Sequence, residues 1–333
     1  DVQLFLFSRT KMTPSVPDKM RRRLYAAALL SGLLLFINAI TSELGAFLSS
    51  GVSEGLSLPI SYIRRLNGYV DPSGPRPLMF TFIDNLNEKE ETLLYAWKEA
   101  WHAAGWDTKV LTLEDAEKHA HFKERDLALR AENMRLGNDE VLSFHRYMAM
   151  AYAGGGWMSD WDVYPLNPLK NGGHLTSLPN EGRFTLYERL GDGKGVVPSI
   201  ISGTAKEYNR IAALLQESAV EYGSKATNWS DLNALCDLRA KNPEAFASED
   251  AVVPGRSVLT GIPDHLVLDT ENWGKDCLIT SGKLAVHFTP VILKGKYLRE
   301  GVTKALASSV SLTWLDMWAG RCTDTTKPND SQQ

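Results

Sequence analysis

The chain has 333 residues, of which 44% are hydrophobic and 23% charged, a composition typical of a globular protein. Its formal net charge is −4, and it has neither the basic stripe of a nucleic-acid-binding protein nor the long charge run of a disordered tail. This length allows about two domains of ~150 residues, or one larger α/β domain with an appendage.

The N-terminal region predicts a membrane anchor followed by a linker. Arg21–Arg23 precede residues 24–40, which carry no charge and reach the low end of the ~17–25 residues that a spanning helix needs. The basic cluster predicts a cytoplasmic tail over 1–23 and a lumenal remainder in the ER or Golgi, as in a single-pass type II signal anchor. A signal peptide, cleaved to release a secreted protein, is the alternative. Residues 41–75 are rich in Ser, Gly and Pro and are expected to form a stem or linker.

Alternating strand and helix patterns begin the expected catalytic domain, residues 76–320, ahead of a flexible tail over 321–333. The apolar run 78–84 predicts a strand, and the helical spacing of 88–105 predicts a helix that ends at a glycine. A second strand over 107–113 leads into another helix. This order indicates an α/β fold with a mixed, mainly parallel sheet flanked by helices.

Two aspartates follow the next helix in the chain. Residues 138–156 form this helix, and its terminal glycines end it because glycine adopts positive φ without a steric penalty. Residues 157–159 then predict a short strand that brings Asp160 and Asp162 to the carboxyl-terminal edge of the sheet. Ligands bind at that edge in open α/β sheets.

Asp160 and Asp162 can reach one ligand together, because residues i and i+2 of an extended backbone point to the same side. Two adjacent carboxylates raise each other's pKa unless a cation neutralises them. Their oxygens suit Mg²⁺ or Mn²⁺, which can bridge a diphosphate. Such a cation stabilises the charge on a departing nucleoside diphosphate, which is the chemistry of glycosyl transfer from a nucleotide sugar.

The residues around this pair resemble a known signature. HRYMAMAYAGGGWMSDWDVYPL is similar to the pattern R, then L-x-x-x-G-G-x-Y-x-D-x-D-V-x-P-L, of glycosyltransferases with the DXD sugar-binding region, which have the GT-A nucleotide-sugar fold. The resemblance is to the group containing α-1,6-mannosyltransferases and α-1,4-galactosyltransferases. The matching positions are Arg146, Gly155, Gly156, Asp160, Asp162, Val163, Pro165 and Leu166.

This resemblance implies a role for each matching residue. Asp162 would ligate Mn²⁺ or Mg²⁺ with Asp160 beside it on the sugar or ribose, and Arg146 would face the donor sugar or phosphates. Gly155 and Gly156 would belong to the donor-binding segment. The implied reaction is a metal-dependent, retaining transfer from a UDP-linked sugar to a hydroxyl of a glycan, glycoprotein or glycolipid. Many family members carry an aspartate three residues before the arginine, where this chain has Ser143, so the donor contacts can differ.

Two alternatives remain open for the same residues. The sequence D-W-D-V also fits the nucleophile motif of haloacid-dehalogenase-type phosphotransferases, in which the first aspartate attacks phosphorus. That motif normally follows a longer apolar strand near the start of a domain. A catalytically inactive, sugar-nucleotide-binding member of the GT-A fold is the other alternative.

Further donor-site candidates lie at both ends of the expected domain. Thr81, Phe82 and Ile83 end the first strand, where the GT-A fold receives the nucleoside, and Phe82 is either a base-stacking ring or a core aromatic. His287, inside an apolar strand-like run, is either a third metal ligand or diphosphate contact, or a hydrogen-bonded core histidine. Lys294 is either a phosphate contact or a solvated surface lysine.

Acceptor-side candidates rest on residue type alone. Glu249 and Asp250 offer a carboxylate base, which an inverting enzyme needs to deprotonate the acceptor hydroxyl. Three further residues are candidates for lining the acceptor cleft: Tyr187, Glu188 and Ser202.

The remaining observations concern the C-terminal half. Ser230 is placed to cap a helix that starts at Asp231. The three cysteines, Cys236, Cys277 and Cys322, contain no C-x-x-C pair, which argues against a zinc site. One disulfide with one free thiol and three reduced thiols both remain open.

Overall fold

A computed structural model describes residues 58–67, 76–84, 88–166, 178–190, 195–226, 228–259, 275–289 and 304–322. All of them lie in the compact unit Leu56–Gln333. The expected cytoplasmic tail and the apolar segment 24–40 lie outside the described residues. Among the helices that are described, none is long and apolar enough to cross a membrane.

The elements alternate between strand and helix as the sequence predicts. The first half contains α2 (Ile60–Asn67), β1 (Leu78–Phe82), α3 (Glu88–Ala103), β2 (Asp107–Leu111), α4 (Leu113–Glu117), α5 (Phe122–Leu129), α6 (Asn138–Tyr152), β3 (Gly155–Ser159) and β4 (Val163–Pro165). The second half contains β5 (Thr185–Arg189), β6 (Val196–Thr204), α7 (Ala205–Tyr222), α8 (Asp231–Lys241), β7 (Ala247–Ser248), β8 (Val252–Pro254), α9 (Gly255–Leu259), α10 (Lys275–Ile279), β9 (Ala285–His287) and α12 (Lys304–Arg321). Short 3₁₀ turns occupy Asn180–Gly182 and Pro243–Ala245.

The described strands form a mixed six-stranded sheet and a smaller three-stranded sheet. The larger sheet has the order β2-β1-β3-β6-β5-β7, and the smaller one β4-β9-β8. In the larger sheet β1 runs parallel to β2 and β3, whereas β6 runs antiparallel to both β3 and β5. The predicted mixed α/β architecture is confirmed.

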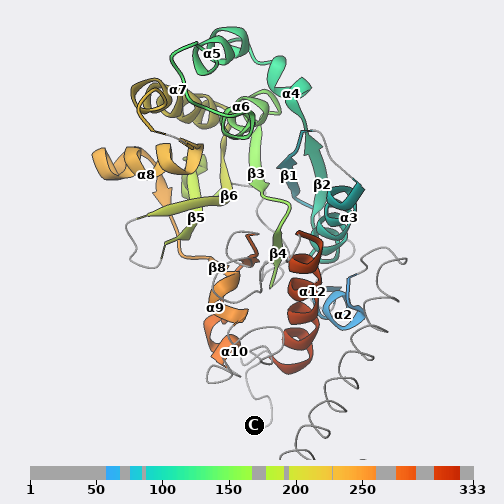
Figure 1. Ribbon diagram of the computed structural model, residues 1–333. Helices are drawn as coiled ribbons and strands as arrows, with labels where there is room; N and C mark the ends of the chain where they lie inside the picture. The colour runs from blue at the N-terminus through green and yellow to red at the C-terminus, as the bar shows by residue number, and fades with distance from the viewer. Residues whose placement is uncertain are drawn as a thin grey trace, which may run out of the picture. The chain divides into compact units, whose positions relative to one another are not determined.

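Each face of the larger sheet buries its own hydrophobic core. Met79 of β1 packs into a core that contains Trp97 of α3, and its neighbour Phe80 packs into a core that contains Tyr147 of α6 and Tyr208 of α7. Successive side chains of a strand point to opposite faces, so helices must cover both sides. In Figure 1, α6 and α7 lie together near the top, while α3 lies below them on the right, with α12 and α2 lower still.

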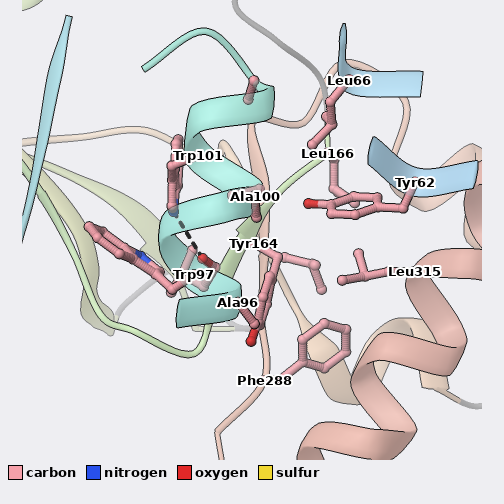
Figure 2. Packing of buried hydrophobic residues seen from close by; sticks show 14 of the residues in the cluster. Tyr62, Leu66, Ala96, Trp97, Ala100, Trp101, Tyr164, Leu166, Phe288 and Leu315 are labelled. Carbon is pink, nitrogen blue, oxygen red and sulfur yellow. Dashed lines mark hydrogen bonds between the residues drawn. The ribbon is translucent and has the colours of Figure 1, made fainter. Parts of the chain in front are cut away.

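Helix α2 corrects the expected linker over 41–75. Tyr62 and Leu66, four residues apart on one helical face, are fully buried, and the Tyr62 hydroxyl donates a hydrogen bond to the Pro165 carbonyl at 2.6 Å. Figure 2 shows Tyr62 between Leu166 and Leu315 of α12. The folded unit therefore already includes Leu58. A short amphipathic helix lies within the segment whose Ser, Gly and Pro content predicts a linker.

The C-terminal boundary also shifts. Helix α12 continues to Arg321, and Cys322 forms a disulfide with Cys277, leaving Cys236 as the free thiol. Of the two cysteine arrangements that the sequence leaves open, one disulfide and one free thiol is the correct one. Arg321 and Cys322, the first residues of the expected flexible tail, therefore belong to the folded unit, and the rest of that tail lies outside the described residues.

The smaller sheet brings a late segment of the chain beside the acidic pair. Val163 of β4 is the register partner of His287 in β9. The Trp101 indole Nε1 donates to the Val163 carbonyl at 3.1 Å, the dashed contact in Figure 2. Phe288, directly after β9, lies 6.3 Å from the Tyr164 ring, measured between centroids. These contacts fix where His287 enters the site.

Candidate functional site

The two aspartates lie on the turn that joins β3 to β4, and main-chain hydrogen bonds hold this turn on both sides. The Asp160 amide donates to the Ser199 carbonyl of β6 at 2.8 Å. The Asp162 carbonyl accepts the Phe288 amide at 3.0 Å, and the Val163 amide closes the turn onto the Asp160 carbonyl at 3.2 Å. The carboxylates therefore project from a backbone that two different sheets restrain.

The fold itself requires the glycine at the start of β3. Gly155 has a φ of +81°, and a Cβ there would lie 2.5 Å from the Ala205 amide nitrogen and 2.6 Å from the Gly203 carbonyl oxygen. Gly156 has a φ of +121°, with the Phe80 ring 3.4 Å from its ideal Cβ position. Close packing and a positive φ thus account for Gly155, and the positive φ alone accounts for Gly156, while their expected contact with the donor stays a prediction.

Asp160, Asp162 and His287 form a cluster that could hold a metal ion. One potential ligand atom from each residue lies within 4.8 Å of the other two. His287 Nε2 is 3.5 Å from Asp162 Oδ1. The His287 side chain is only 4% exposed and that of Asp162 16%, whereas the Asp160 side chain is 33% exposed. The cluster is therefore closed on the histidine side and open to solvent at Asp160.

Glu188 of β5 contacts His287 at Nδ1, the ring nitrogen that does not face Asp162. Its carboxylate oxygen lies 2.7 Å from His287 Nδ1 and also accepts the Ser199 hydroxyl proton. The Glu188 side chain is only 2% exposed. When His287 Nδ1 carries the proton shared with Glu188, Nε2 faces Asp162 with its lone pair available for a cation. A carboxylate behind a ligating histidine is a common outer-shell arrangement in metal sites.

The electrostatics of the cluster favour a neutralising cation. Burial raises the pKa of Asp162 to about 7, and repulsion from Asp160 adds to this effect against the attraction of His287. Burial lowers the pKa of His287, but the carboxylates of Asp162 and Glu188 outweigh it and raise that pKa to about 9. Two carboxylates and one imidazole are ligands that suit Mn²⁺ and also fit Mg²⁺. The residues therefore fit the expected metal, which would displace the proton that His287 Nε2 carries in its absence.

Arg146 of α6 lies beside the acidic pair but is bound by protein carboxylates. Its Nη1 donates to Asp160 Oδ1 at 2.8 Å, and its Nη2 donates to an Asp231 carboxylate oxygen. Asp231, at the start of α8, also accepts the Tyr147 hydroxyl proton at 2.8 Å. The predicted cap at Ser230 is confirmed, because Ser230 and Asn233 form a capping box at this helix start.

The nucleoside candidates lie at the expected edge with unequal exposure. Thr81 and Phe82 end β1, which runs beside β3, and Ile83 directly follows it. Thr81 and Ile83 are buried, and Phe82 is partly exposed, so Phe82 is the one of the three with a side chain that a ligand can reach. Lys294 lies outside the described residues.

The acceptor-side candidates have other partners in the structure. The Tyr187 and Ser202 hydroxyls are buried and 2.8 Å apart, so these residues belong to the core rather than to a cleft. Glu249 accepts a hydrogen bond from Asn180, and Asp250 forms an ion pair with Lys283 at 2.8 Å.

Comparisons with known proteins give a family and a distant structural likeness. A family model described as a domain of unknown function, DUF8765, matches residues 70–246, more than half of the chain. Among curated proteins, none matches the sequence. The apo structure of the bifunctional glycosyltransferase WbbM is similar with 10% identity and a TM-score of 0.37, over 67% of this chain and 47% of that one. The chain thus spans about half the length of WbbM.

Proposed function

We propose that this chain, which belongs to the DUF8765 family, is a metal-dependent glycosyltransferase that moves a sugar from a nucleoside-diphosphate donor to a hydroxyl acceptor. The observation that carries the proposal is the cluster of Asp160, Asp162 and His287, whose ligand atoms lie within 4.8 Å of one another. The histidine comes from a strand far along the chain from the two aspartates. The fold, and not closeness in the sequence, therefore brings the three residues together.

Each residue has a defined part in this proposal. Asp162 and His287 offer ligand atoms to Mn²⁺ or Mg²⁺ from the closed side of the site, and the more exposed Asp160 completes the cluster on the solvent side. Glu188 keeps the His287 ring oriented. When bound, the cation supplies charge stabilisation for a departing diphosphate.

The donor is proposed to be UDP-linked, with Phe82 at the nucleoside end, and the acceptor to be a glycan, glycoprotein or glycolipid. The proposed location is the lumen of the ER or Golgi, with the segment 24–40 as the anchor or a cleaved signal. The Cys277–Cys322 disulfide supports this location, because disulfides persist in oxidising compartments and are rare in the cytosol.

A donor screen with the full chain, purified in mild detergent, tests the proposal. The measurement is nucleoside-diphosphate release from a panel of nucleotide sugars with Mn²⁺. We expect release from at least one donor, stimulation by Mn²⁺, and a loss of 100-fold or more in Asp162→Asn, on the order of the ~10²–10³-fold effect of removing one charge-stabilising group. Asp107→Asn, which changes a carboxylate whose side chain is 59% exposed and which has no part in the proposed site, is the matched control.

The same screen separates the alternatives. The proposal fails if no donor is bound or hydrolysed, or if Asp162→Asn behaves like the parent. Phosphate trapped covalently on Asp160 would instead establish a haloacid-dehalogenase-type phosphotransferase. Mn²⁺-dependent nucleotide binding without turnover would establish an inactive, sugar-nucleotide-binding protein.

A further inference from the structure

Arg146 bridges two carboxylates that come from different parts of the fold. Asp160 belongs to the turn after β3, and Asp231 begins α8. The side chains of Arg146 and Asp231 are 11% and 6% exposed, so this ion pair is largely shielded from water. Tyr147 donates to the same Asp231 carboxylate. The site therefore contains a chain of contacts that runs inward from the acidic pair to α8.

The guanidinium has few donors left for a substrate. Nη1 is taken by Asp160, and Nη2 by Asp231 with the Tyr147 hydroxyl 3.5 Å away. Nε is buried and has no hydrogen-bond partner within the part of the chain that the structure describes. Burial lowers the pKa of Arg146, but Asp231, Tyr147 and Asp160 together raise it well above its ordinary value. The side chain is thus a permanent cation facing two protein anions.

Asp231 is itself held firmly. Its backbone amide donates to the Ser143 hydroxyl at 3.1 Å, and Ser143 donates in turn to the Glu140 carbonyl at 2.6 Å. The Asp231 carboxylate lies in the first turn of α8, where the positive end of the helix dipole favours a negative charge. The hydrogen bond between Asp231 and Ser143 therefore joins helices α8 and α6 next to the Arg146 guanidinium.

We infer that Asp231 is a positioning residue that holds Arg146 so that Asp160 keeps an oxygen free for the cation, an inference that rests on the proposed function. Arg146 then acts through Asp160 and not on the donor phosphates. Without Asp231, Asp160 is the one fixed anion left to the guanidinium among the described residues, and the guanidinium can bind both of its oxygens, as guanidinium groups commonly do. It would then compete with the metal for Asp160.

Manganese binding to the full chain, measured by electron paramagnetic resonance without nucleotide, tests this inference independently of activity. Asp231→Asn keeps an acceptor for Arg146 and Tyr147 but removes the charge. We expect its Mn²⁺ dissociation constant to rise about 10-fold or more, the lower end of the effect of outer-shell changes. Asp237→Asn is the control, since Asp237 lies on the same helix, is paired with Lys241, and has a side chain that is 19% exposed.

A double-variant cycle and a nucleotide titration complete the test. Arg146→Lys should weaken Mn²⁺ binding, and combining it with Asp231→Asn should weaken binding no further than the larger single effect, because both act on Asp160. UDP affinity measured without Mn²⁺ should match the parent in each variant. If Asp231→Asn does not fold, Tyr147→Phe should show a smaller loss of Mn²⁺ affinity in the same direction.

Three results would overturn the inference. Parent-like Mn²⁺ affinity in Asp231→Asn, or a loss of UDP affinity without Mn²⁺ in Arg146→Lys, would show that the arginine does not act through Asp160. The proposed function would survive that outcome. A parent chain that binds no Mn²⁺ would remove the proposed function, and the inference with it.

Discussion

His287 Nδ1 lies 2.7 Å from a carboxylate oxygen of Glu188, and neither side chain is more than 4% exposed. The pair joins β9 of the smaller sheet to β5 of the larger one. The Ser199 hydroxyl donates to the same glutamate oxygen, so Glu188 is held from a third strand. The orientation of His287 therefore depends on contacts that reach across both sheets.

Replacing Glu188 with glutamine should weaken metal binding without abolishing it. The glutamine oxygen can still accept the His287 Nδ1 proton, but the negative charge that makes the imidazole a stronger ligand is lost. We expect the Mn²⁺ dissociation constant of Glu188→Gln to rise ~10–100-fold, measured by isothermal titration calorimetry on the full chain.

Glu249→Gln is the control for this substitution, because Glu249 lies shortly after β7 beside the same strand and is bonded to Asn180. It should bind Mn²⁺ like the parent. Unchanged Mn²⁺ affinity in Glu188→Gln would show that the Glu188 contact does not support a ligand.

The sequence predicts the parts of this site that depend on local patterns. Strand and helix periodicity predicts β1, α3, β2 and α6. The i, i+2 spacing predicts that Asp160 and Asp162 lie together on an extended backbone, whereas the structure places them on a turn that the Val163 amide closes onto the Asp160 carbonyl. The glycines mark the start of β3. Local spacing thus locates the acidic pair, but it leaves two readings of His287 open.

The partners of these residues depend on contacts that no local pattern contains. Glu188 reaches His287 only because β5 and β9 belong to two sheets that meet at the turn after β3. Asp231 reads in sequence as an ordinary acidic residue at a helix start, yet it binds Arg146 because α8 packs against α6. Residue type is the one signal of these contacts that the sequence offers, since buried carboxylates near an arginine or histidine tend to pair.

Two neighbouring glycines at the end of α6 offer a matched test of how β3 is positioned. Both have positive φ, +100° for Gly154 and +81° for Gly155. A Cβ on Gly154 would meet nothing within 4 Å, whereas one on Gly155 would lie 2.5 Å from backbone. Gly154→Ala therefore carries backbone strain alone, and Gly155→Ala adds a steric clash.

We expect Gly154→Ala to lower the free energy of unfolding by about 1–2 kcal/mol, the cost of positive φ in a residue with a side chain. Gly155→Ala should lower it by more than about 3 kcal/mol or prevent folding, because β3 or the β6–α7 junction must move. Urea denaturation followed by tryptophan fluorescence measures both. Equal losses in the two variants would mean that the close approach at Gly155 does not exist.

His145 predicts an acid-sensitive contribution to stability. It is completely buried on α6, its ring centroid lies 4.9 Å from that of Phe122, and its Nε2 is 3.1 Å from Asp126 Oδ1 on α5. Burial lowers the pKa of His145 to about 4, and Arg130 acts in the same direction, against the attraction of Asp126. The folded chain therefore keeps His145 neutral at pH values where the unfolded chain protonates it.

The sign of the pH dependence follows from proton binding. Between the ordinary histidine pKa of 6.5 and the folded value of about 4, the unfolded state binds more protons, so stability falls as the pH is lowered. The contribution is complete above pH 6.5 and is lost progressively as the pH falls to about 4. A shift of this size corresponds to roughly 3 kcal/mol.

The unfolding free energy of His145→Phe, relative to that of the parent, should therefore rise as the pH is lowered from 7.5 to 4. Phenylalanine keeps an aromatic ring beside Phe122 but has no group to protonate, so the variant should lose less stability in acid than the parent by roughly 3 kcal/mol. His121→Gln changes a histidine whose side chain is 55% exposed and should keep the parent's pH dependence. Parallel curves for the parent and His145→Phe would show that His145 takes up its proton equally well in the folded and unfolded states.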